Sequence, residues 1–134
     1  MESLIFVVGA VVLVDGRILV CRRASHKSNA GLWEFPGGKI SEGEAPSDAL
    51  VREIREELGV HIRVGELLDR SQTLVEESTV DLAVYWATLL SDPPVASTDH
   101  DELRWVLPKE LKELTWTKPD LPAVWKLQHL DSCN

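Results

Sequence analysis

Apolar and polar positions at the start of the chain predict a hairpin of two strands. Residues 4–14 and 17–23 are apolar, β-branched runs, and Asp15 and Gly16 between them supply the positive φ angles of a tight turn. The first run is too short to span a membrane. We interpret it as a buried strand rather than a signal peptide, because Glu2 replaces the usual basic start and no small-residue cleavage site follows.

The segment after the hairpin is predicted to be mostly loop. Residues 24–32 are small and polar, which indicates an exposed loop, and residues 33–36 indicate a short strand that ends at Gly37 and Gly38. A turn-rich connection is expected over residues 39–44.

A helix is predicted between Pro46 and Gly59. Proline is tolerated in the first turn of a helix, where its missing N–H does no harm, and glycine is common just past the end. Leu50, Ile54 and Leu58 recur every four residues. One face of this helix therefore packs inward, while the opposite face is charged.

The second half of the chain is predicted to contain further strands followed by helices. The predicted extended segments are 61–69, 71–77, 79–90 and 103–107, and the predicted helices are 108–114 and 119–130. The sequence shows no repeat, low-complexity tract or linker, so we expect a single domain over residues 1–134.

Composition and charge narrow the class of ligand. Apolar residues make up 44% of the 134 positions and charged residues 27%, as in soluble globular proteins. The formal net charge of −8 opposes binding to nucleic-acid polymers, although divalent metal could still bridge acidic residues to a small polyphosphate. Cys21 and Cys133 form no disulfide framework or metal-binding spacing, so we expect a reducing, cytoplasmic setting.

Three carboxylates on the predicted helix are the strongest chemical signal. Glu53, Glu56 and Glu57 share an arc of roughly 100° beside the apolar face. Like charges so close repel one another, and a divalent cation would relieve the repulsion. The alternative is an ordinary solvated face on which Arg52 and Arg55 neutralise their neighbours.

Residues 38–60 place these glutamates in a longer pattern, GKISEGEAPSDALVREIREELGV. This segment is similar to the Nudix box: Gly, five residues, Glu, seven residues, Arg-Glu-apolar-any-Glu-Glu-any-Gly-apolar, with no departure. The likeness to MutT-type members extends to residues 5–14, 20–23 and 33–39 and to the strand around Trp105. The resemblance implies an α+β fold, an α/β/α sandwich of a mixed sheet flanked by helices, with the box as a loop–helix–loop.

The resemblance also implies roles for the box residues. The expected metal ligands are Glu53, Glu56, Glu57 and the backbone carbonyl of Gly37, with Mg²⁺ as the cofactor and Mn²⁺ able to substitute. Glu53 is the favoured base for the attacking water. Arg52 and Glu44 complete the catalytic set by orienting the helix and its loop.

MutT-type enzymes bring one more carboxylate from a loop before a late strand. Counting back from Trp105, Asp99 is the best match, with Asp101 and Glu102 as fallbacks and a solvated acidic turn as the alternative. His100 is expected to be incidental.

Candidate substrate contacts lie outside the box. Arg23 and Lys39 could meet phosphate oxygens or be ordinary surface cations. Phe35 and Trp116 are candidate contacts for the nucleotide, the latter by stacking on the base. Asp120 could accept a hydrogen bond from the cytosine amine or merely cap the last helix.

The resemblance implies hydrolysis of a nucleoside triphosphate to the monophosphate and pyrophosphate. The Pro-Asp-Leu-Pro at 119–122 looks like the CTP-pyrophosphohydrolase branch, which favours (d)CTP and 5-substituted cytosine nucleotides, whereas bacterial MutT tends to have Asn at the matching place. Alternatives are an 8-oxo-dGTP diphosphatase, a nucleotide-binding module without activity, and hydrolysis of ADP-ribose or a dinucleoside polyphosphate. We expect a small nucleotide as partner, no polymer or membrane, and a monomer or homodimer.

Overall fold

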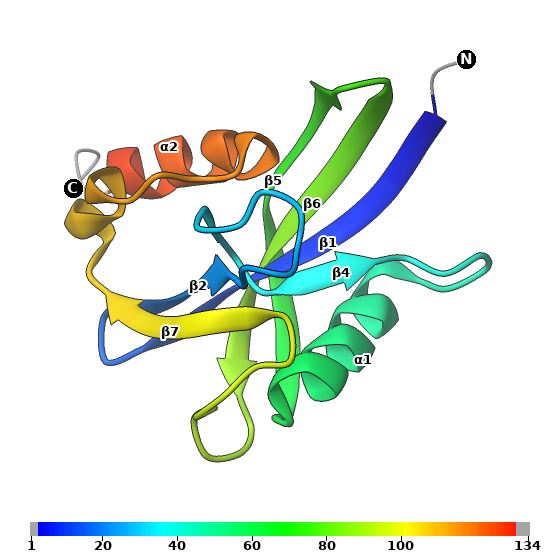
Figure 1. Ribbon diagram of the computed structural model, residues 1–134. Helices are drawn as coiled ribbons and strands as arrows, with labels where there is room; N and C mark the ends of the chain where they lie inside the picture. Colours follow the sequence, from blue (N-terminus) through cyan, green and yellow to red (C-terminus); the bar gives the residue numbers. More distant parts are fainter. Residues whose placement is uncertain (1–2, 131–134) are drawn as a thin grey trace.

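The computed structural model, which describes residues 3–130, begins with the predicted hairpin (Figure 1). Strand β1 (Ser3–Val14) and strand β2 (Arg17–Arg23) are antiparallel. Asp15 and Gly16 between them have φ angles of 52° and 77°, as a hairpin turn with two left-handed residues requires.

β1 is the central strand of a mixed, seven-stranded sheet. It runs parallel to β6 (Ser78–Leu89), which pairs antiparallel with β5 (Ile62–Val75). The other neighbour of β1 changes along its length, from β4 (Gly37–Lys39) to the start of β2. Strand β2 continues into pairing with β3 (Trp33–Glu34) and β7 (His100–Val106), so these strands diverge from the β5–β6 side.

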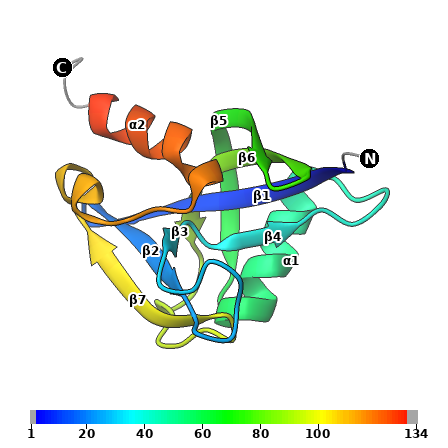
Figure 2. The same cartoon turned by 45° about the horizontal axis from the view of Figure 1, so that its top comes forward.

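Helices cover both faces of the sheet, as Figures 1 and 2 show. On one face, Ala10 and Val12 of β1 share an apolar cluster with α1 (Pro46–Leu58). On the other, Val11 packs in a second cluster with α2 (Leu121–Leu130). Alternate residues of β1 thus face different layers, because side chains alternate along a strand. This arrangement confirms the predicted α/β/α sandwich.

The helix predicted between Pro46 and Gly59 is confirmed as α1. It begins at Pro46 and ends at Leu58, and the N–H of Gly59, at φ 68°, donates to the Arg55 carbonyl. Leu50, Ile54 and Leu58 are buried against the sheet. The charged residues of α1 therefore lie beside the face that packs on the sheet.

Two predicted strand boundaries were wrong. The segments 61–69 and 71–77 are one strand, β5, because Arg70 stays in register with β6 and pairs with buried Asp81 at 2.9 Å. Gly37 and Gly38, where the short strand was predicted to end, and Lys39, the first residue of the predicted turn, pair with β1 as β4. A Cβ at Gly37 would lie 1.9 Å from the Val8 carbonyl oxygen, so only glycine permits this close approach.

The helices predicted over 108–114 and 119–130 differ in type from expectation. The first is the 3₁₀ helix η1 (Pro108–Glu113), and the second opens with the 3₁₀ turn η2 (Lys118–Asp120) before α2. Cys21 is buried and unpaired with another cysteine, while Cys133 lies outside the described residues. Within residues 3–130, no helix is both long and apolar enough to cross a membrane.

Candidate active site

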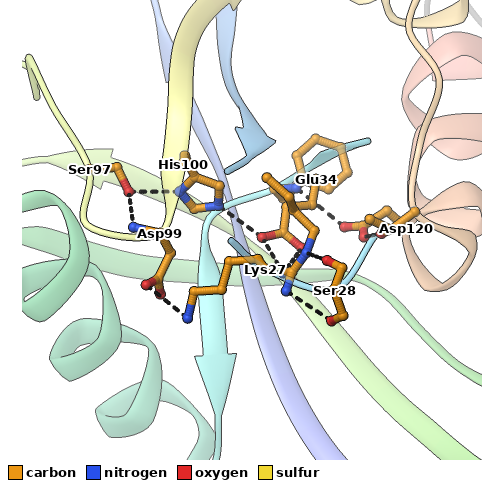
Figure 3. Close-up of polar contacts among 10 residues, drawn as sticks. Lys27, Ser28, Glu34, Ser97, Asp99, His100 and Asp120 are labelled. Atoms are coloured by element: carbon orange, nitrogen blue, oxygen red, sulfur yellow. Dashed lines mark hydrogen bonds and ion pairs between the residues drawn. The ribbon is translucent and has the colours of Figure 1, made fainter. Parts of the chain in front are cut away.

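A cavity of about 300 Å³ opens between the charged face of α1 and η2. Its floor is apolar and comes from the central strands, with Val7 of β1 and Leu82 of β6 among the lining residues. Charged groups surround this floor. In Figure 3, Lys27 and Asp99 lie toward α1, Asp120 lies toward α2, and Glu34 lies between them. A cavity of this size with a few convergent polar groups suits a small ligand.

Arg52 is the centre of the hydrogen-bond network on α1. Its Nε and Nη2 donate to the two oxygens of Glu44 at 2.9 and 2.8 Å, and its Nη1 donates to Glu53 at 2.9 Å and to Glu56 at 3.3 Å. Nη2 also reaches the Lys39 carbonyl at 3.1 Å. The helix, the preceding loop and β4 are thus tied to a single guanidinium group.

Glu44 anchors the loop before α1 through this network. Hydrogen bonds from Arg52, and then from the Ser41 N–H, lower the pKa of Glu44 to about 2. Bonds to Glu44 and Glu53 in turn raise the pKa of Arg52. Both groups stay charged near neutral pH, in keeping with the orienting role predicted for them.

Glu57 is the box glutamate that lines the cavity. Burial, with a hydrogen bond to Asp99 and the charges of Asp99, Glu53 and Glu34, raises the pKa of Glu57 to about 9. Its buried Oε2 has no hydrogen-bond partner among the residues that the structure describes. A buried acidic group with an orphaned oxygen, crowded by other carboxylates, fits the surroundings of a bound cation.

Glu53 and Glu56 accept hydrogen bonds from Arg52 and, unlike Glu57, do not line the cavity. The Glu53 carboxylate lies over Gly38, where a Cβ would come within 2.4 Å of it, and the Glu56 side chain is 55% exposed. Among residues 3–130, no three acidic, histidine or cysteine side chains already converge as a metal site. The predicted metal ligands are therefore not assembled in this structure. Hydrogen bonds from Arg52 to Glu53 and Glu56, and the hydrogen bond between Glu57 and Asp99, reduce the repulsion among these carboxyl groups.

Asp99 lines the cavity beside Glu57, as the loop before β7 was predicted to provide. The Lys27 ammonium lies 3.1 Å from its Oδ1. Burial would raise the pKa of Asp99, but hydrogen bonds with Glu57 and Lys27 outweigh it and lower that pKa. The fallback residues Asp101 and Glu102 instead pair with Arg22 and do not line the cavity.

His100 is not incidental, contrary to the sequence prediction. Its side chain is 1% exposed, its Nε2 lies 2.8 Å from Glu34 Oε2, and its Nδ1 lies 2.7 Å from Ser97 Oγ (Figure 3). Ser97 Oγ also accepts the N–H of Asp99. The histidine therefore connects the loop that carries Asp99 to the cavity wall formed by Glu34.

Arg23 lies in the cavity wall, but its donors are already engaged. Its Nη1 donates to both oxygens of Glu34 at 3.0 Å, and its Nε donates to the Ser28 carbonyl at 2.6 Å. To bind phosphate as predicted, Arg23 would have to give up hydrogen bonds that hold Glu34 and the Ser28 carbonyl. Lys39 also lines the cavity, and its side chain is exposed.

The aromatic candidates differ in position. Phe35 lines the cavity, whereas Trp116 is 7% exposed, lies behind Phe35 at a ring-centroid distance of 5.0 Å, and donates its indole N–H to the Leu111 carbonyl. Trp116 therefore does not line the cavity, and the structure does not place it for the predicted stacking on a base. Its ring supports Phe35 and packs in the same core cluster as Trp33.

Asp120 is buried at the end of the cavity near α2. Its Oδ1 accepts the Phe35 N–H at 3.3 Å and its Oδ2 accepts the Thr117 hydroxyl, so its hydrogen bonds do not cap α2. Burial raises the pKa of Asp120 to about 7, with the Thr117 hydrogen bond acting against the shift and the Glu34 charge adding to it. Both protonation states are therefore accessible near neutral pH.

This raised pKa predicts how stability depends on pH. The folded protein holds the Asp120 proton up to about pH 7, whereas the unfolded chain releases it near pH 4. The free energy of unfolding therefore falls as pH rises between these values. D120N, which carries no titrating proton, should gain in melting temperature relative to the wild type on going from pH 4 to pH 8. A difference in melting temperature that does not change with pH would contradict the assignment.

The site combines acidic groups of one helix with a cavity for a small ligand, an arrangement that suits metal-assisted hydrolysis. The family model described as NUDIX domain matches residues 4–126. The chain therefore belongs to the Nudix family, whose hydrolases generally use divalent metal cations.

Relatives with known names match along most of the chain. The CTP pyrophosphohydrolase of Escherichia coli (strain K12) is 36% identical over 122 residues, which cover 91% of this chain and 90% of the relative. The putative 8-oxo-dGTP diphosphatase 2 of Mycobacterium tuberculosis (strain ATCC 25618 / H37Rv) is 37% identical, with coverage of 90% and 84%. The solution structure of the E. coli ORF135 protein superposes with a TM-score of 0.81 at 32% identity, covering 99% of this chain and 94% of that one.

Proposed function

We propose that this Nudix pyrophosphohydrolase uses Mg²⁺ to convert nucleoside triphosphates to monophosphates and pyrophosphate, and that it prefers (d)CTP and 5-substituted cytosine nucleotides. The observation that carries the proposal is the cavity with two different ends. Glu57 and Asp99 stand at one end, and Asp120 beside Phe35 stands at the other. A nucleotide has the same division, with an anionic phosphate chain at one end and a flat base at the other.

The phosphate end provides the donors for the cation. Glu53, Glu56, Glu57 and Asp99, with the Gly37 carbonyl, are the oxygen ligands that Mg²⁺ prefers. When bound, the cation neutralises phosphate oxygens and activates water. Glu53 is suited to take the proton of the attacking water, because Arg52 holds its carboxylate by a hydrogen bond of 2.9 Å.

The base end supports cytosine through Asp120. Its two oxygens each accept one hydrogen bond from the protein and keep a second lone pair for a donor. The exocyclic amine of cytosine is such a donor. The name of the E. coli relative, CTP pyrophosphohydrolase, supports the same choice.

A second candidate substrate is 8-oxo-dGTP, and the pKa of Asp120 favours it. Because this pKa is about 7, a protonated Asp120 could donate a hydrogen bond to an acceptor on oxidised guanine. The name of the M. tuberculosis relative, putative 8-oxo-dGTP diphosphatase 2, points to the same nucleotide.

Competition between dCTP and 8-oxo-dGTP tests the proposal. With Mg²⁺ and a nucleotide panel that includes ADP-ribose, we expect pyrophosphate release to stop on addition of EDTA, and kcat/KM for dCTP to exceed that for 8-oxo-dGTP by about tenfold. The reverse order would assign the enzyme to oxidised guanine. Turnover of ADP-ribose alone would place the substrate outside the triphosphates, and binding without turnover would indicate a non-catalytic module.

A further inference from the structure

We propose that Lys27 binds the phosphate chain of the substrate, exchanging its ion pair with Asp99 for that contact when Asp99 takes part in cation binding. The inference rests on the proposed function. It concerns a residue in the loop between β2 and β3 that lies outside the Nudix box and outside the other motif positions of the sequence.

Lys27 is placed at the phosphate end of the cavity by a well-anchored loop. Its N–H donates to the Ala24 carbonyl at 3.0 Å, and the Ala24 N–H donates to the Asp99 carbonyl at 3.1 Å. The Ser28 carbonyl accepts from the Arg23 side chain. Hydrogen bonds therefore hold the backbone on both sides of Lys27, while its side chain is partly exposed.

The cavity is lined by more acidic than basic side chains. Four carboxyl groups line it, those of Glu34, Glu57, Asp99 and Asp120. An incoming triphosphate adds several negative charges, and Arg23 already donates to Glu34 and Ser28. Lys27 and Lys39 are the lining cations left to face phosphate.

Lys27 differs from Lys39 because its ammonium pairs with a candidate metal ligand. The distance from Lys27 Nζ to Asp99 Oδ1 is 3.1 Å, and the two side chains are 36% and 30% exposed. A lysine released from Asp99 remains beside the phosphate path with its charge unpaired. Its three N–H donors are then available to phosphate oxygens. Before substrate arrives, the same ammonium offsets the negative charge of Asp99.

This exchange predicts that Lys27→Met weakens the binding of a phosphate chain but tightens the binding of a metal ion. Removal of the Lys27 ammonium deprives the phosphate chain of a charged hydrogen bond, so the Kd for inorganic tripolyphosphate in the presence of Mg²⁺ should rise by about tenfold. Asp99 no longer has a competing cation, so the Kd for Mn²⁺ in the protein without nucleotide should fall about twofold to fivefold. A residue that merely supports the loop would weaken both together.

Calorimetry with tripolyphosphate and electron paramagnetic resonance with Mn²⁺ measure the two constants. Lys39→Met should weaken tripolyphosphate binding without tightening Mn²⁺, and Lys109→Met, on exposed η1 outside the cavity, should change neither. Unchanged tripolyphosphate affinity in Lys27→Met, or weakening of both ligands, would overturn the inference. Neither measurement needs turnover. A wild-type protein that hydrolyses no nucleotide would therefore count against the proposed function, while the two dissociation constants would still decide the role of Lys27.

Discussion

Glu57→Gln is expected to lower kcat by about a hundredfold or more, because the amide cannot serve as an anionic metal ligand. Glutamine has nearly the same shape and is neutral. Without cation, the pKa of Glu57 is about 9, so the wild-type side chain is itself neutral at pH 7. The substitution should therefore leave folding intact while it removes activity.

The measurement combines steady-state kinetics with Mg²⁺ and thermal unfolding in EDTA. We expect the melting temperature of Glu57→Gln to equal or exceed that of the wild type, because the side chain at position 57 then no longer has to be kept protonated in the folded state. Glu113→Gln, on the exposed end of η1, is the matched control and should retain full activity. A Glu57→Gln enzyme with wild-type kcat would refute the assignment of this residue.

The charged face of α1 could be predicted from sequence because its information is local. Residues three and four positions apart share a helix face, so Leu50, Ile54 and Leu58 fix which side is buried and thereby where Glu53 and Glu57 lie. The hairpin at residues 15–16 is equally local. Such elements depend on neighbours within a few positions of the chain.

The other half of the site depends on contacts between distant positions. Glu34 and His100 are 66 residues apart in sequence, and Lys27 meets Asp99 across a similar interval. No periodicity marks a histidine that will be buried between a serine and a glutamate. The position of Trp116 behind Phe35 likewise depends on a β-bridge between Trp116 and the distant residue Trp33, which a residue-by-residue pattern does not encode.

Arg52→Lys is expected to lower kcat by about tenfold to a hundredfold, although the charge is retained. The guanidinium spans Glu44, Glu53 and the Lys39 carbonyl at the same time. A lysine has its donors on one nitrogen and cannot reach all three. Glu53 would then lose its fixed orientation, and the loop held by Glu44 would loosen.

A cycle of variants separates orientation from charge. If Arg52 acts partly through Glu44, then Glu44→Gln combined with Arg52→Lys should cost less than the sum of the two single changes, because both break the same bidentate contact. Arg55→Lys, an exposed arginine on the same helix, is the matched control and should leave kcat unchanged. An Arg52→Lys enzyme whose kcat and melting temperature match those of Arg55→Lys would show that charge alone suffices, and the guanidinium geometry would then have no part in positioning Glu53.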